Sequence, residues 1–229
     1  MALQSDAAML LFYDIAGDPA DHDDWHTYEH LHERLSIPGF LRATRWTAIE
    51  GAPRYLALYE VADVSMAASP AYLVRLNQPT PWTKSMMARF RGMVRGFSRV
   101  VAAAGYGLGN AALAARFTPN AGEDGRLRER LAALLPSLAA ARGMASAQLF
   151  EPGPPPPMTS EQALRGPDTP MPWLLLATAY EATALGPVAA GLLPDLDPAA
   201  RVELGTYALH FTATATEVAR TPPNPPRLP

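Results

Sequence analysis

The sequence predicts an α+β fold built from two consecutive βαββαβ units whose sheets pack face to face around a barrel-like core. Two observations lead to this prediction. Segments with strand and helix periodicity follow one another in the order βαββαβ over the first half, and the same order returns in the second half. A βαββαβ unit forms a four-stranded antiparallel sheet with its helices on one face, so a second unit can cover the other face.

The first half consists of apolar or alternating segments separated by turn residues. Pro38-Gly39 and Gly51-Ala52-Pro53 are typical stops between elements. In chain order we expect a strand at Ala7–Ile15, a helix at Asp21–Ser36, strands at Phe40–Glu50 and Arg54–Val61, helices at Ser65–Leu76 and Trp82–Arg91, and a strand at Met93–Ala103.

The second half repeats this order more loosely. We expect strands at Ala111–Thr118, Ser146–Phe150, Trp173–Glu181 and Val202–Thr212, a helix at Gly125–Ala141 that Pro136 should kink, and a weak helix at Leu185–Leu193. Eight of the 24 prolines fall between Pro152 and Pro172, which predicts an extended loop. The predicted organisation is therefore a first unit at residues 1–104, a second, degenerate unit at 105–215 and a proline-rich, disordered tail at 216–229.

Composition excludes several classes of function. The chain of 229 residues has no cysteine, so disulfides, thiolate catalysis and cysteine metal sites are excluded. A net charge of −3 gives no electrostatic reason to expect nucleic acid or an anionic membrane as a partner. No apolar run reaches the roughly 18 residues of a membrane span. We expect a cytoplasmic protein with a small organic ligand and no cofactor, either a monomer with an internal pseudo-twofold axis or a homodimer.

Four of the five histidines lie within the predicted helix at Asp21–Ser36. At about 100° per residue, His22, His26 and His30 share one face with glutamates, opposite an apolar stripe. Three interpretations remain open. The face is solvated and structural, His26 and His30 chelate a metal at their i,i+4 spacing, or His30 transfers protons with a nearby carboxylate. We expect no metal ligand among the site residues.

The segment W25-H-T-Y-E-H-L-H-E-R-L-S-I-P-G-F40 resembles the Trp…Glu-His-Leu…Glu-Arg…Pro-Gly-Phe signature of small EthD-like and related dimeric α+β-barrel proteins. The resemblance covers about residues 7 to 100 and implies two ferredoxin-like units fused in tandem. It implies functional roles for Glu29, His30 and Arg34. Because this fold hosts many chemistries, it does not decide the function.

The function expected from these residues is the binding of a small, largely apolar molecule between the two sheets. If the protein is an enzyme, cofactor-free proton transfer (isomerisation, dehydration or cyclisation) is expected, with His30 as general acid and base, Glu29 as its orienter and Arg34 as an anion or structural anchor. The aromatic residues expected to line the ligand site are Tyr13, Trp46, Tyr55, Tyr59 and Trp82. The alternative is a non-catalytic accessory protein in which Glu29, His30 and Arg34 fix the helix to the loop around Pro38–Phe40.

Overall fold

Two βαββαβ units follow one another in the computed structural model, which describes residues 2–197 and 199–222. The first unit contains strands β1 (Ala7–Ile15), β2 (Phe40–Glu50), β3 (Tyr55–Val61) and β4 (Phe90–Gly105). Its helical segments are α1 (Pro19–Trp25), η1 (His26–His30), α2 (Leu31–Leu35), η2 (Val64–Ala68), α3 (Pro70–Leu76) and α4 (Pro81–Met87).

The second unit has five strands and one long helix in the part of the chain that the structure describes. Its strands are β5 (Ala111–Pro119), β6 (Met144–Pro152), β7 (Thr169–Pro170), β8 (Trp173–Ala179) and β9 (Ala199–Thr214). Its helical segments are α5 (Asp124–Ala140), α6 (Ser160–Arg165), η3 (Ala182–Ala184), α7 (Leu185–Leu192), η4 (Leu193–Leu196) and α8 (Ala215–Arg220).

Eight antiparallel strands close into a barrel in the part of the chain that the structure describes. Around the barrel the order is β1-β3-β2-β9-β5-β8-β6-β4, and β4 pairs back to β1. Each unit places its last strand beside its first, so both units have the same strand order. The seams join β2 to β9 and β4 to β6, which pairs the second strand of each unit with the last strand of the other. The predicted α+β fold with two tandem units is confirmed.

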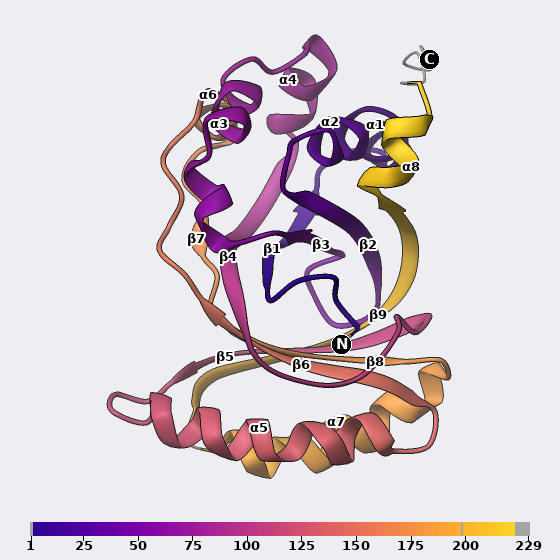
Figure 1. The fold of residues 1–229 in the computed structure, drawn as a ribbon, viewed down its shortest axis with the longest axis vertical. Helices are drawn as coiled ribbons and strands as arrows, with labels where there is room; N and C mark the ends of the chain where they lie inside the picture. Colours follow the sequence, from indigo (N-terminus) through magenta and orange to yellow (C-terminus); the bar gives the residue numbers. More distant parts are fainter. Residues whose placement is uncertain (1, 198, 223–229) are drawn as a thin grey trace.

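Helices cover the outside of the barrel, and side chains fill its inside. Figure 1 shows α5 and α7 below the sheet of the second unit, and the helices of the first unit at the opposite end of the molecule. Alternation along the strands explains the layers, because successive side chains point to opposite faces. Leu10 and Phe12 face the interior with Leu174 and Leu176 of the second unit, whereas Met9, Leu11 and Tyr13 face the helices.

Three segments differ from the sequence-based prediction. The proline-rich loop after β6 contains α6 and β7, and β7 pairs in parallel with Val94–Arg95 of β4. Residues 215–220, which overlap the predicted tail, form α8 behind a capping box at Thr214 and Glu217. Residues 223–229 of that tail lie outside the described residues. Helix α5 continues through Pro136.

A search of the described helices finds none that is long and apolar enough to cross a membrane.

Candidate functional site

The histidine-bearing helix runs from Pro19 to Leu35 with a π-helical turn in its middle. Asp18 caps its start by accepting a hydrogen bond from the Ala20 amide. Inside the turn, the Leu31 amide donates to the His26 carbonyl, five residues back. In an α-helix a residue four positions on lies about 40° further round, and the wider π-turn offsets this drift. Residues four apart therefore line up along one side.

The residues that line up are His22, His26, His30 and Arg34, here called the polar stripe. Their exposed fractions are 0%, 3%, 7% and 2%, so the stripe faces the sheet and is buried. The interpretation of this face as solvated is therefore wrong. Trp25, Leu31 and Leu35 on the other side are buried too, because α4 and the neighbouring strands also cover the helix.

Tyrosines on the sheet supply hydrogen-bond partners for the stripe. His22 Nδ1 donates to Asp23 at 3.0 Å, which leaves its Nε2 to accept from the Tyr13 hydroxyl at 3.1 Å. The Tyr59 hydroxyl lies 3.0 Å from His26 Nε2. Nδ1 of both His26 and His30 is buried without a hydrogen-bond partner. A polar stripe can thus pack against a sheet because the sheet carries hydroxyl groups at matching positions.

Burial keeps the His26 and His30 imidazoles of the polar stripe neutral. Loss of hydration lowers the pKa of His30 well below 6.5, and the Arg34 guanidinium lowers it further. The pKa of His26 is also far below 6.5, first because of burial and then because of Arg45 and His30. Both imidazoles are therefore uncharged at neutral pH, and either could accept a proton from a bound molecule.

A cavity of about 20 Å³ lies at the end of the stripe, between α2, α4, α6 and the sheet. Such a volume holds about one water molecule. Its apolar wall includes Met87, Phe90 and Met93, and its polar wall is formed by the side chains of His30, Arg34, Arg95, Glu161 and Arg165. We call this cluster the His30 chamber.

Helix α6 closes the chamber from the second unit. Arg34 Nη2 donates to both carboxylate oxygens of Glu161, at 2.7 and 2.6 Å. Burial disfavours the charge of Arg34, but the adjacent Glu161 carboxylate outweighs this and raises the pKa of Arg34. Arg95 Nη2 donates to Gln162 Oε1 at 3.3 Å, and Arg95 Nε lies 2.9 Å from an oxygen of Asp168. Figure 1 shows the orange segment with β7 and α6 running along β4 to a position beside α3.

Glu29 does not meet His30 in the way the sequence suggested. Its carboxylate accepts from the Trp25 indole at 3.2 Å and from the hydroxyls of Thr80 and Thr83 at 2.5 and 3.1 Å. These contacts connect the histidine helix to the beginning of α4. No hydrogen bond joins Glu29 to His30 among the described residues, so the structure does not place Glu29 as an orienter.

The aromatic residues proposed for the ligand site fall into three places. Tyr13, Tyr55 and Tyr59 lie on the helix-facing side of the sheet, where the Tyr13 and Tyr55 rings stack at 5.2 Å. Trp46 lies on the opposite side, inside the barrel. Trp82 is on α4, with its indole donating to Asp21 at 3.3 Å. A single aromatic pocket of Trp46, Tyr55 and Tyr59 is therefore excluded by the register of the strands.

Side chains also fill much of the space expected between the two sheets. The barrel interior contains Phe12, Trp46, Phe150 and Tyr207, together with leucines from both units. The ligand position expected between the sheets is thus packed with side chains, and the chamber on the helix-facing side is the better candidate.

No group of three or more histidine, cysteine, aspartate or glutamate side chains is arranged to hold a metal ion within residues 2–197 and 199–222. His26 and His30 have ring centroids 5.4 Å apart, and no carboxylate completes a set around them. This arrangement gives the chelation alternative no support beyond the sequence spacing.

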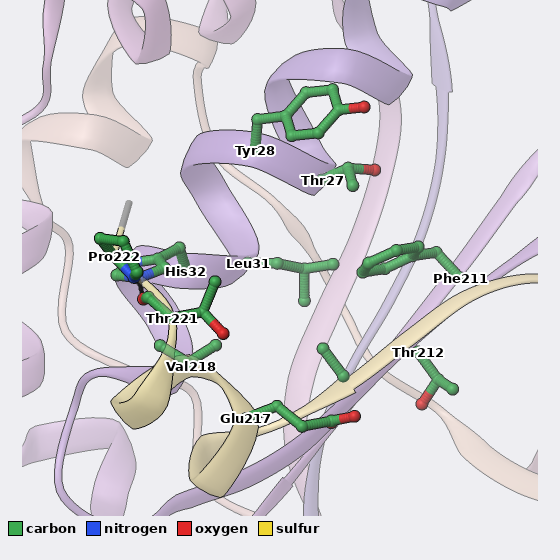
Figure 2. Close-up of a pocket in the computed structure, with 11 residues that line it drawn as sticks. Thr27, Tyr28, Leu31, His32, Phe211, Thr212, Glu217, Val218, Thr221 and Pro222 are labelled. Carbon is green, nitrogen blue, oxygen red and sulfur yellow. Dashed lines mark hydrogen bonds between the residues drawn. The ribbon is translucent and has the colours of Figure 1, made fainter. Parts of the chain in front are cut away.

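A separate, more open groove of about 450 Å³ lies between the histidine helix and β9–α8. Figure 2 shows Leu31 and His32 on one side, and Phe211, Glu217 and Val218 on the other. The His32 ring lies within hydrogen-bond distance of the Thr221 carbonyl, at 3.2 Å. The groove contains none of the residues that the sequence marked as functional.

Sequence reasoning missed Glu161, Gln162 and Asp168. One signal was available, because Thr159 followed three residues later by Gln162 is a helix-start pattern. The structure has Thr159 as the N-cap that accepts from the Gln162 amide. Nothing in the sequence shows that this short helix crosses to the other unit.

Comparisons with known proteins show the fold alone. No protein-family model and no curated protein matches the chain. A solved anthrone oxidase-like protein is similar over 94% of this chain and 96% of its own, with a TM-score of 0.66 and 7% identity. A candidate monooxygenase from Fusobacterium nucleatum covers 93% and 96% of the two chains, with a TM-score of 0.59 and 9% identity. Another from Lactobacillus acidophilus covers 91% and 96%, with a TM-score of 0.56 and 11% identity. The chain therefore has the dimeric α+β-barrel fold.

Proposed function

We propose that this protein binds a small, largely apolar organic molecule in the His30 chamber, and that His30 exchanges a proton with it. The observation that carries the proposal is the gathering of His30, Arg34 and Arg95 in one buried place against a wall of methionine and phenylalanine. Buried ionisable groups with shifted pKa values are costly, and they concentrate at functional sites.

The chemistry follows from the state of each group. Neutral His30 takes a proton from a C–H or O–H group of the ligand on a ring nitrogen, and the electron pair stays on the ligand as an oxyanion or enolate. Arg34 or Arg95 stabilises that negative charge. Return of the proton to a different atom completes an isomerisation, without any change in oxidation state. Glu29 fixes the helix to α4 and takes no part in this step.

A non-catalytic accessory or binding protein, in which Glu29, His30 and Arg34 are structural, is the second candidate. It is favoured by the size of the chamber, since about 20 Å³ is far below the roughly 300 Å³ of an ordinary ligand pocket. In this alternative, Arg34 with Glu161 and Glu29 with Thr80 serve only to attach α6 and α4 to the histidine helix.

Methyl NMR of labelled methionines tests the binding site. Benzyl alcohol should shift the methyl signals of Met87 and Met93 in the wild type, and His30→Gln should weaken this response. His32→Gln is the matched control, because His32 lies on the same helix but borders the groove of Figure 2. Met87 and Met93 signals that do not respond to benzyl alcohol, or that respond equally in wild type and His30→Gln, would contradict the proposal.

Deuterium exchange separates catalysis from binding. A ligand that co-purifies with the protein is identified by native mass spectrometry and then incubated with the protein in D₂O. Incorporation of deuterium by the wild type, and its loss in His30→Gln, supports proton transfer. Binding without incorporation supports the second candidate.

The resemblance of Trp25–Phe40 to EthD-like proteins supports this placement of the site, and it stays a prediction. We further propose that the units at residues 1–104 and 105–215 descend from a duplication, and that the protein works in the cytoplasm.

A further inference from the structure

The Glu161 carboxylate in the chamber indicates the chemical class of the ligand. We propose that the ligand carries a carboxylate, that Arg34 binds this carboxylate, and that Glu161 on α6 holds the same position in the closed form described here. This inference rests on the proposed function and specifies the ligand of the same site.

The geometry of the Arg34–Glu161 pair is the first argument. Arg34 Nη2 reaches both oxygens of the carboxylate, at 2.7 and 2.6 Å, while Arg34 Nη1 is buried without a partner. A guanidinium normally binds a carboxylate through two nitrogens in a parallel fork. Glu161 thus satisfies one half of the guanidinium, and a free carboxylate that could enter in another orientation would engage both nitrogens.

The distribution of charge is the second argument. The base of the chamber, on the first unit, carries Arg34 and Arg95 as cations next to a neutral His30. Both anions that neutralise them, Glu161 and Asp168, come from the segment around α6. Asp168 lies beyond the end of α6, next to β7, which pairs with β4, so the departure of α6 takes the counterion away from Arg34. Because unpaired buried charges are strongly unfavourable, the open chamber selects an anion.

The attachment of α6 is the third argument, because it is polar and small. Apart from the contacts inside the chamber, the Ser160 amide donates to Asn77 at the end of α3, at 2.8 Å. The helix has six residues, of which four are exposed or partly exposed, and it follows a run of prolines that form no regular backbone ladder. An element with few apolar contacts opens at a low free-energy cost, unlike the strands beneath it.

The remaining lining indicates the rest of the ligand. Met9, Met87 and Met93 with Phe90 form the apolar wall. Unbranched methionine side chains adapt to different shapes, so the chamber can enlarge once α6 has moved. The expected ligand is therefore a small carboxylic acid with an apolar or aromatic body, and benzoate is a suitable probe.

The test compares benzoate with uncharged benzyl alcohol, using the methionine methyl signals of Met87 and Met93. Glu161→Gln removes the internal anion and should raise benzoate affinity by about tenfold or more, since a closed state lowers apparent affinity in proportion to its population. Benzyl alcohol affinity should change much less. Arg34→Gln with Glu161→Gln should abolish the preference for benzoate.

A second variant leaves the chamber unaltered. Asn77→Ala removes the outer attachment of α6 and should also raise benzoate affinity, by less than Glu161→Gln does. In the wild type, benzoate should increase hydrogen exchange at the amides of Ser160–Arg165, since the helix is displaced.

The outcomes separate the two proposals. If benzyl alcohol shifts the two methionines but benzoate gains nothing in Glu161→Gln and Asn77→Ala, or if benzoate protects α6 from exchange, the carboxylate inference is wrong and the binding site stands. If neither probe shifts these signals in any variant, the proposed function is wrong as well.

Discussion

The first helix of each unit packs a stripe of residues four positions apart against its sheet, and the two stripes have opposite chemistry. In the second unit, Leu127, Leu131 and Leu135 of α5 lie on apolar strands. In the first unit, the corresponding stripe is His22, His26, His30 and Arg34, and it lies on tyrosines. Because both stripes are buried, the fold accommodates either an apolar or a polar stripe at this position.

The difference between the two stripes separates residues that stabilise the fold from residues that could have a function. A leucine stripe stabilises the fold by burying apolar surface and needs no hydrogen-bond partners on the sheet. A stripe of imidazoles requires hydrogen-bond partners for its ring nitrogens, and burial lowers the pKa values of His26 and His30 well below 6.5. The helix-facing core of the second unit is therefore apolar, whereas that of the first unit carries the histidines of the candidate site.

The largest effect is expected in the leucine stripe. Leu131→Ala should lower the free energy of unfolding by about 3 kcal/mol, because it leaves a cavity under α5. Urea unfolding measures this change. Glu129→Ala, an exposed position on the same helix, should stay within about 0.5 kcal/mol of the wild type. Equal effects at both positions would show that α5 is not packed as described.

Acid should destabilise the histidine stripe next. The folded pKa values of His26 and His30 lie well below 6.5, so folding favours the neutral form. This stability is complete above the unfolded pKa of about 6.5 and is lost as pH falls below it, by roughly 1 kcal/mol per histidine at pH 5.5. Chemical unfolding at pH 8 and pH 5.5 measures the loss. His26→Gln should remove its share of this loss.

Loss of the contact between the units should have a local effect. Arg34→Met removes both hydrogen bonds to Glu161, which contribute about 2 kcal/mol to the docking of α6. The amides of α6 should then exchange about thirtyfold faster, while those of α5 keep their wild-type rates. Unchanged exchange in α6 would mean that other contacts hold this helix.

The smallest effect is expected at one hydroxyl. Tyr59→Phe deprives His26 Nε2 of its partner and should cost about 1 kcal/mol of unfolding free energy. Tyr106→Phe, at a position that is 83% exposed, should cost nothing measurable. A Tyr59→Phe variant as stable as the wild type would indicate that the His26 imidazole finds another partner.

Most of the fold could be predicted because the strands are clear in the sequence. The bounds of β1 and β2 agree with the prediction, and β9 and β4 are each longer by a few residues. Strand alternation and the turns at Pro38-Gly39 and Gly51 depend on local chemistry, which the sequence contains. Identification of the helix at Asp21–Ser36 was also correct in outline.

The site was harder, because its partners are distant in the sequence. A helical projection places His22, His26 and His30 on one face. It cannot show that the hydroxyls of Tyr13 and Tyr59 form hydrogen bonds with His22 and His26. Arg34 meets Glu161 across 127 positions of the chain. Trp46 and Tyr55 are aromatic neighbours in the sheet, yet the register turns them to opposite faces.

The two seams of the barrel, β2 with β9 and β4 with β6, join halves of one polypeptide. Because the two halves are covalently linked, their association depends on an effective concentration, which is about millimolar for a short connection, and not on the concentration of the protein. Dilution therefore cannot separate the halves or withdraw α6 from Arg34. Under the carboxylate proposal, the occupancy of the chamber by Glu161 therefore varies with the concentration of the ligand and not with that of the protein.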